Sequence, residues 1–257
     1  KDPQTDCYAG AIDQIPQGWY DTGKWFPLTL TAEDYPGEVY YYYSEFATGM
    51  FADFNYGHGD VCADSPAFKA VVNAIGTWLE CGVDGLRLDA VKHIYADEGG
   101  YENIQFWKAF YNAINTHYAT YAEFREDLTG KADENIFMVG ECLSGEDVCL
   151  PFYEGLPSVF DFQYWWSLRD VLNNENGSGF VGGMCDRYYA HLNKRADAIY
   201  TPKISNHDED RTAHTPGGYT PKIRLAATML LTSPGRPIVY QGEELGYWGH
   251  KGNGDEY

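Results

Sequence analysis

Three acidic residues follow short apolar runs and could carry nucleophilic or acid–base chemistry. They are Asp89, Glu141 and Asp208. An aspartate or glutamate at the end of a strand is most often a helix cap, a surface charge or half of an ion pair. Three carboxylates at the ends of three different strands, one near an arginine and another beside His207, instead indicate a shared active site.

The neighbours of these carboxylates predict different protonation states. Arg87 precedes Asp89 by two residues on an alternating strand, so both face one side and Arg87 keeps Asp89 ionised. Glu141 follows the apolar run 136–139, where partial desolvation and nearby carboxylates favour the protonated form. Cleaving a glycosidic bond with retention needs such a pair, a nucleophile and an acid roughly 5 Å apart.

Alternating helix and strand patterns would position these residues. Ser65 and Pro66 predict the start of a helix that Gly82 ends, and the segment 85–89 alternates as a strand. Further helices are predicted near 102–118, between 164 and 195 and at 220–231, with strands at 136–140, 159–163, 202–206 and 237–241. This order predicts a parallel sheet covered by helices, either doubly wound or barrel-shaped, and charges at several strand ends favour the barrel.

Composition limits the possible partners and cofactors. The 257 residues carry a net charge of −20, which disfavours nucleic acid, anionic membranes and phosphorylated substrates. The 22 Tyr and 7 Trp could stack on sugar faces or be ordinary core residues. The six cysteines lack zinc-site spacing and are expected to be mostly unpaired, with a Cys142–Cys149 bridge left open. No apolar run is long enough to span a membrane.

Several motifs resemble one enzyme family. The segment 82–93, Gly-Val-Asp-Gly-Leu-Arg-Leu-Asp-Ala-Val-Lys-His, resembles the nucleophile strand of the α-amylase family, glycoside hydrolase family 13. Residues 139–141 resemble its acid/base strand, and 205–208 the strand of its third carboxylate. Residues 51–55 and 235–244 are similar to the end of its loop domain and to its eighth strand. The resemblance covers nearly the whole chain and is closest to starch-degrading α-amylases of gut Bacteroidetes.

The resemblance implies a role for each site residue. Asp89 would form the glycosyl-enzyme intermediate, Glu141 would act as acid and base, and Asp208 would stabilise the distorted sugar. The implied substrate-binding residues are Arg87 and His207 at the same subsite, Lys92 and His93 on the leaving-group side, and Asp210 and Arg211 at a more distant sugar.

The family also implies a calcium ion that clamps its loop domain to the barrel. Asp53 and the backbone carbonyl of His93 are the matching ligands, and oxygen ligands suit Ca²⁺. Trp19, Trp25 and the run 40–43 would border the sugar cleft.

The implied fold is a partial TIM (β/α)8 barrel. Strands four to eight would be present, and the first three strands and the last helix missing. Residues 1–60, which show no sustained helix or strand period, would form an irregular loop domain inserted after the third strand, and residues 61–257 the catalytic barrel segment. Five strands cannot close a barrel, so residues 1–257 alone are expected to be unstable and inactive.

The implied function is retaining hydrolysis of α-1,4-glucosidic bonds in starch and maltooligosaccharides. A 4-α-glucanotransferase would use the same intermediate, and a non-catalytic carbohydrate-binding relative would lack the carboxylates. The expected partners are an α-glucan substrate and other starch-uptake proteins at the cell surface, and the expected location is secreted or cell-surface.

Overall fold

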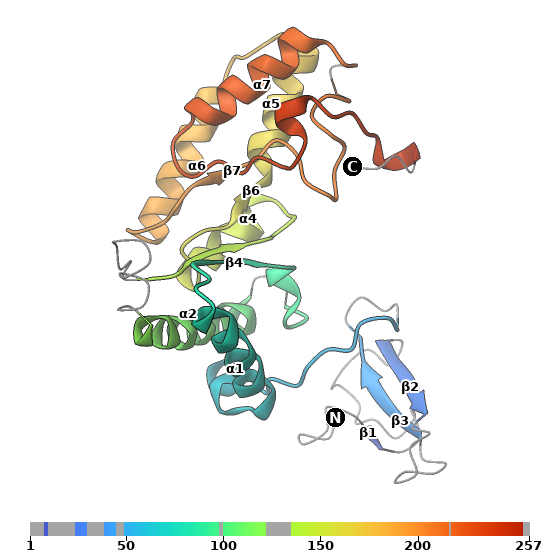
Figure 1. The fold of residues 1–257 in the computed structure, drawn as a ribbon, viewed down its shortest axis with the longest axis vertical. Helices are drawn as coiled ribbons and strands as arrows, with labels where there is room; N and C mark the ends of the chain where they lie inside the picture. Colours follow the sequence, from blue (N-terminus) through green and yellow to red (C-terminus); the bar gives the residue numbers. More distant parts are fainter. Residues whose placement is uncertain are drawn as a thin grey trace. The chain divides into compact units, whose positions relative to one another are not determined.

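The structure is a computed structural model that describes residues 8–9, 24–29, 39–44, 49–97, 100–121, 135–215 and 217–253 (Figure 1). The chain divides into two compact units. The first comprises Lys1–Asp84 and Lys92–Ile136, and the second comprises Gly85–Val91 and Phe137–Tyr257. Across the described ranges, no helix combines the length and apolar character that crossing a membrane requires.

The first unit contains an antiparallel sheet of strand order β1-β3-β2. The strands are β1 (Tyr8–Ala9), β2 (Trp25–Thr29) and β3 (Val39–Tyr43). Trp25 pairs with Tyr43, and their buried rings meet edge-on with centroids 5.7 Å apart. The expectation that residues 1–60 lack regular strands was therefore wrong for these segments. The strand β3 was missed because its sequence, Val-Tyr-Tyr-Tyr-Tyr, shows no alternation of apolar and polar residues from which a strand could be predicted.

The first unit also contains helices among its described residues. They are η3 (Gly59–Asp64), α1 (Pro66–Glu80) and α2 (Tyr101–Thr120). The short η4 (Val91–His93) begins at the last residue of the second unit's first segment. The Ser65 hydroxyl accepts a hydrogen bond from the Phe68 backbone N–H at 3.1 Å, which confirms the predicted N-cap. Phe68 then packs edge-on against Phe106 of α2, with centroids 5.6 Å apart.

The second unit is built on parallel strand pairs. Strands β4 (Gly85–Leu88) and β5 (Phe137–Gly140) pair, as do β6 (Phe160–Asp161) and β7 (Thr201–Pro202). Single parallel bridges, Gly140–Val159 and Lys203–Ile238, extend this order on both sides of the second pair. The predicted strands at 85–89 and 136–140 are confirmed as β4 and β5. The strand predicted at 202–206 begins one residue earlier and ends at Pro202, and that at 237–241 is reduced to one bridge at Ile238.

The strand predicted at 159–163 extends two residues too far at its C-terminal end. Its last two residues belong to α5 (Phe162–Asn174), because the Asp161 carboxylate accepts a hydrogen bond from the Tyr164 backbone N–H at 2.9 Å and caps the helix. The remaining helices are α4 (Glu146–Cys149), η5 (Leu150–Glu154), α6 (Phe180–Lys194), α7 (Thr220–Thr232), η6 (Glu243–Leu245) and η7 (Lys251–Asn253).

Helices α5, α6 and α7 pack together around one apolar core (Figure 1). Its buried members are Tyr164, Trp165, Leu168, Leu172, Phe180, Met184, Tyr200, Ile204, Ala226 and Leu230. Burying aromatic and aliphatic side chains of this size is the main favourable contribution to folding in such a unit.

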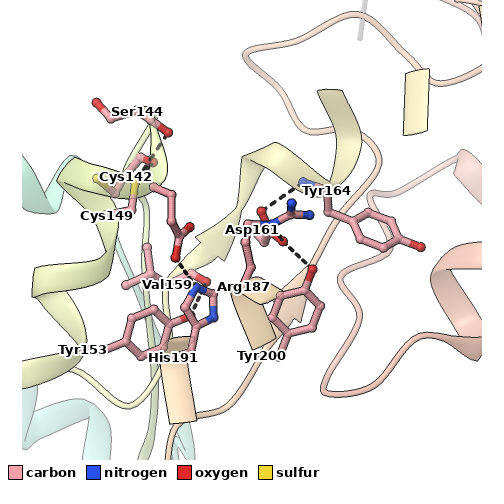
Figure 2. Close-up of polar contacts among 11 residues, drawn as sticks. Cys142, Ser144, Cys149, Tyr153, Val159, Asp161, Tyr164, Arg187, His191 and Tyr200 are labelled. Carbon is pink, nitrogen blue, oxygen red and sulfur yellow. Dashed lines mark hydrogen bonds and ion pairs between the residues drawn. The ribbon is translucent and has the colours of Figure 1, made fainter. Parts of the chain in front are cut away.

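One buried carboxylate connects the strands to these helices. Asp161, 5% exposed, accepts hydrogen bonds from Arg187 Nε at 2.9 Å and from the Tyr200 hydroxyl, in addition to capping α5 (Figure 2). Burial and the Asp161 charge raise the pKa of Tyr200 far above its ordinary value, so its hydroxyl stays a donor. Asp161 thereby fixes β6, α5 and α6 to the segment before β7.

We predict that Asp161→Asn lowers the free energy of unfolding by about 3–5 kcal/mol, because it leaves the Arg187 charge buried without its partner. Urea denaturation measures this loss. Asp197→Asn is the matched control: Asp197 pairs with Arg195 at 2.8 Å but is exposed, and its substitution should cost less than about 1 kcal/mol. Equal losses in the two variants would contradict the assignment.

Candidate active site

Asp89 and Glu141 follow two adjacent parallel strands. Leu88 of β4 lies opposite Gly140 of β5, and the pairing continues beyond it. The Glu141 N–H donates to the Leu88 carbonyl at 2.8 Å, and the Val91 N–H donates to the Glu141 carbonyl at 3.0 Å. Because the strands are parallel, both carboxylates leave the sheet at the same edge.

Asp89 carries the predicted arginine partner. Arg87 Nη1 donates to Asp89 Oδ1 from the same side of β4. The Asp89 side chain is 76% exposed, so a ligand can reach it. An accessible carboxylate is what a nucleophile at a sugar carbon requires.

The backbone around the two carboxylates is tightly constrained. Ala90 has φ +46°, in the left-handed region that non-glycine residues rarely adopt, and its N–H donates to Glu141 Oε2 at 3.2 Å. A Cβ atom on Gly140 would come within 2.9 Å of Leu156 Cδ1 and 3.0 Å of Val91 Cγ1. Only glycine therefore fits immediately before Glu141 without moving its neighbours.

Glu141 lies in a different environment from Asp89. It is 8% exposed, and burial is the main cause that raises its pKa above the ordinary value. The charges of Asp89 and Asp208 act in the same direction, while the Ala90 N–H and Arg87 oppose the rise. The predicted direction of the Glu141 pKa is confirmed. Since both aspartates act on it electrostatically, the three carboxylates lie in one region of the second unit.

Asp208 lies in the loop that follows β7. Its N–H donates to Asn206 Oδ1 at 3.0 Å, which fixes the local turn. His207 Nε2 lies 3.1 Å from Asp208 Oδ2, and Lys251 Nζ lies 3.7 Å from Oδ1. Both side chains of the His207–Asp208 pair are exposed, so a ligand can reach them.

Lys203 is a charged residue near the site that the sequence analysis missed. It is 1% exposed, pairs with Glu209 and lies 3.9 Å from the centroid of the Phe162 ring. Burial lowers its pKa, and the charges of Glu209 and Glu141 oppose this. The alternation of residues 203–205 could have indicated that Lys203 lies on the opposite side of the chain from Ile204, which packs into the helical core.

The two residues predicted to reach a distant sugar already have protein partners. Arg211 is buried, with its guanidinium 4.3 Å from the centroid of Tyr240 and Nη1 donating to the Gln241 carbonyl. Asp210 Oδ1 accepts from the Lys251 N–H at 2.8 Å and lies 2.9 Å from His250 Nδ1. Contact of Asp210 or Arg211 with sugar stays a prediction.

One group in the described part of the chain has the composition of a metal site. Asp210, His214 and His250 offer ligand atoms that all lie within 4.8 Å of one another. The two imidazole rings are stacked, however, 4.3 Å apart and inclined by 3°. An ion in the plane of one ring would lie outside the plane of the other, so this arrangement does not fit a shared ion unless a ring turns.

The remaining predicted substrate-binding and calcium-binding residues lie in the first unit. Lys92 and His93 belong to η4, and both are partly buried. Asp53 and His93 line the same cavity of about 40 Å³, together with Asn55 and Tyr95. Carboxylate, amide and backbone oxygens around a small cavity are a donor set that suits Ca²⁺.

Two of the aromatic residues predicted to border the sugar cleft are buried. Trp25 and Tyr43 are buried against each other, so their faces are not available for a sugar in this structure. Trp19 and the side chain of Tyr40 lie outside the described residues.

Comparison with known proteins gives a consistent family. The model of the alpha-amylase catalytic domain matches residues 31–256. Alpha-amylase SusG of Bacteroides thetaiotaomicron is 44% identical over 220 residues, covering 86% of this chain and 30% of that protein. Alpha-amylase 3 of Dictyoglomus thermophilum is 34% identical over 221 residues, covering 84% of this chain and 38% of that protein. The chain thus spans about a third of the length of these curated relatives.

A solved structure shares the fold. The alpha-amylase from H. orenii superposes with a TM-score of 0.65 at 27% identity, covering 83% of this chain and 39% of that one.

We predict that Glu141→Gln stabilises the protein near pH 7 and has no such effect below about pH 4. A carboxyl group whose pKa is raised on folding costs stability as the pH rises through that pKa, and is protonated in both states below its ordinary value of about 4.3. Thermal unfolding midpoints at both pH values test this, with the exposed Glu244→Gln as control. An unchanged midpoint at pH 7 would refute the burial argument.

Proposed function

This chain belongs to the alpha-amylase family, whose catalytic-domain model it matches, and we propose that it is a retaining glycoside hydrolase acting on α-1,4-glucosidic bonds of starch and maltooligosaccharides. The observation that carries the proposal is the contrast between two carboxyl groups on adjacent strand ends. Asp89 is exposed and paired with Arg87, whereas Glu141 is buried with a raised pKa. Such a contrast assigns the nucleophile and the acid in retaining enzymes.

In the first step, Asp89 attacks the anomeric carbon while Glu141 donates its proton to the departing glycosidic oxygen. The products of this step are a glycosyl ester on Asp89 and a free sugar end. In the second step, the Glu141 carboxylate takes a proton from water, and the resulting hydroxide releases the glycosyl group from Asp89. Burial of Glu141 supports the acid role, because it raises the pKa and so favours the protonated form that donates to the leaving group.

The other predicted residues would position the sugar. Asp208 would bind hydroxyl groups of the distorted ring, with Arg87 and His207 at the same subsite. We propose Lys92 and His93 for the leaving-group side. Asp210 and Arg211 would reach a more distant sugar from the positions in which their protein partners hold them.

The alpha-amylase catalytic domain is a TIM barrel. We propose that β4, β5, β6, β7 and the segment at Ile238 correspond to strands four to eight of such a barrel. Their parallel order supports this correspondence. In the same scheme, residues 1–60 form the loop domain inserted after the third strand and residues 61–257 belong to the barrel.

We further propose that Asp53 and the His93 backbone carbonyl hold a Ca²⁺ ion. Their position around one small cavity with Asn55 supports this assignment. The ion would supply structural cross-linking of the loop segment and η4, and no proton transfer depends on it.

The proposed partners are an α-glucan and, at the cell surface, other starch-uptake proteins. A secreted or cell-surface location goes with this proposal, and the net charge of −20 keeps the chain away from anionic lipid.

We predict that Asp89→Asn, in the protein expressed from its complete reading frame, lowers kcat/KM on maltohexaose by at least about 10³-fold, because an amide cannot form the glycosyl ester. Reducing-sugar release measures the rate. The exposed Asp197→Asn should retain wild-type activity. Hydrolysis that survives in Asp89→Asn would exclude the mechanism. Products longer than the maltohexaose supplied would indicate a glucanotransferase.

We predict that a chelator lowers the thermal midpoint and that added Ca²⁺ restores it. Asp53→Asn should raise the Ca²⁺ concentration that restores the midpoint by about tenfold or more, because it removes a charged ligand. Asp60→Asn, an exposed acidic residue of the same unit, is the control and should respond as the wild type does. A midpoint that is indifferent to chelator would rule out the calcium site.

A further inference from the structure

Two buried thiols lie in contact directly after Glu141. Cys142 is 0% exposed and Cys149 is 7% exposed, and their sulfur atoms are 3.0 Å apart (Figure 2). The Cys149 thiol also lies 3.1 Å from the Cys142 carbonyl and 3.5 Å from the Ser144 carbonyl. Among the described residues, neither cysteine belongs to a group of side chains that could hold a metal ion. The reaction to consider is therefore one between the two thiols.

The surrounding structure holds Cys149 in this position. Cys149 is the last residue of α4, and its N–H donates to the Gly145 carbonyl at 3.1 Å. Glu146, on the same short helix, contacts the buried His191 at 2.8 Å, and the His191 ring stacks on Tyr153 with centroids 4.3 Å apart. Figure 2 shows Tyr153 and His191 beside the cysteine loop. The helix is therefore anchored to α6 and cannot easily carry Cys149 away.

We propose that Cys142 and Cys149 form a disulfide when the protein folds in the presence of a small-molecule disulfide such as oxidised glutathione. The S–S distance in a disulfide is about 2.0 Å, so the two sulfurs need to approach by only about 1 Å. A small rotation of the side chains supplies this movement, without displacing α4.

The reaction balances as two thiol–disulfide exchanges. One cysteine thiolate attacks glutathione disulfide, forms a mixed disulfide and releases one glutathione thiolate. The second cysteine thiolate then attacks the protein sulfur of the mixed disulfide and releases the second glutathione. The protein loses two protons and two electrons, and the oxidant becomes two glutathione thiols.

The exchange belongs to folding rather than to the folded state. In the folded chain, contact with Cys142 and burial raise the pKa of the Cys149 thiol, which suppresses the thiolate that must attack. The same burial later keeps reductants away from the bond. Once formed, the disulfide should therefore resist reduction until the protein unfolds.

The bond would act on the acid/base residue through the chain. Cys142 is bonded to Glu141, and residues 142–145 connect this strand end to α4. Closing this loop covalently removes open conformations in which Glu141 could shift relative to Asp89.

The test folds the full-length protein with oxidised glutathione, alkylates it in denaturant without reductant, and maps the peptides by mass spectrometry. We expect Cys142 and Cys149 in one cross-linked species, two hydrogens lighter than the dithiol form and alkylated only after reduction. Cys81, which is exposed, should be alkylated throughout and serves as the internal control. Alkylation of both cysteines without reduction, a bond to another cysteine, or retained glutathione would each overturn the proposal.

Hydrogen exchange measures the structural consequence. Amides of 143–148 should exchange at least about tenfold more slowly in the oxidised protein than in the reduced protein. The double variant Cys142→Ser/Cys149→Ser should match the reduced wild type under both conditions. Equal exchange in oxidised and reduced wild type would overturn the stabilising role. Neither measurement uses substrate, so its outcome is independent of the proposed hydrolase activity.

Discussion

The pairing of β4 with β5 is the constraint on which the site depends. Because Leu88 lies opposite Gly140, the backbone bond from the Glu141 N–H to Leu88 fixes where each carboxylate leaves the sheet. A shift of one residue would turn Glu141 to the other face of β5. Asp89 and Glu141 thus need no direct contact to be held in register. Their surroundings differ, because Asp89 is exposed beside Arg87 whereas burial raises the pKa of Glu141.

Buried charges support this edge from within the second unit. Asp161 links β6 to α5 and α6. Lys203 pairs with Glu209 and also interacts electrostatically with Glu141. Apolar residues could fill the same volume, but they would not direct hydrogen bonds to a helix start, a guanidinium and a hydroxyl simultaneously. The unit therefore combines an aromatic and aliphatic core with a few polar connections whose geometry is specific.

Sequence patterns predicted the features that depend on neighbouring residues. Ser65 as a cap and the Arg87–Asp89 side of β4 follow from local rules, and the apolar run before Glu141 indicated its raised pKa. Features set by distant contacts were missed. Phe162 is apolar enough for a strand, yet the Asp161 cap makes it helical. The alternation at 203–205 bears on Lys203, but it does not identify Glu209 as the partner of Lys203.

The contacts around Gly140 have a consequence for how this protein can vary. A Cβ atom at that position would lie 2.9 Å from Leu156 Cδ1 and 3.0 Å from Val91 Cγ1, so the Leu156 and Val91 side chains would have to shift. Val91 also donates its backbone N–H to the Glu141 carbonyl. A substitution at position 140 would therefore reach the acid/base residue through the packing of Val91, although position 140 performs no chemistry of its own.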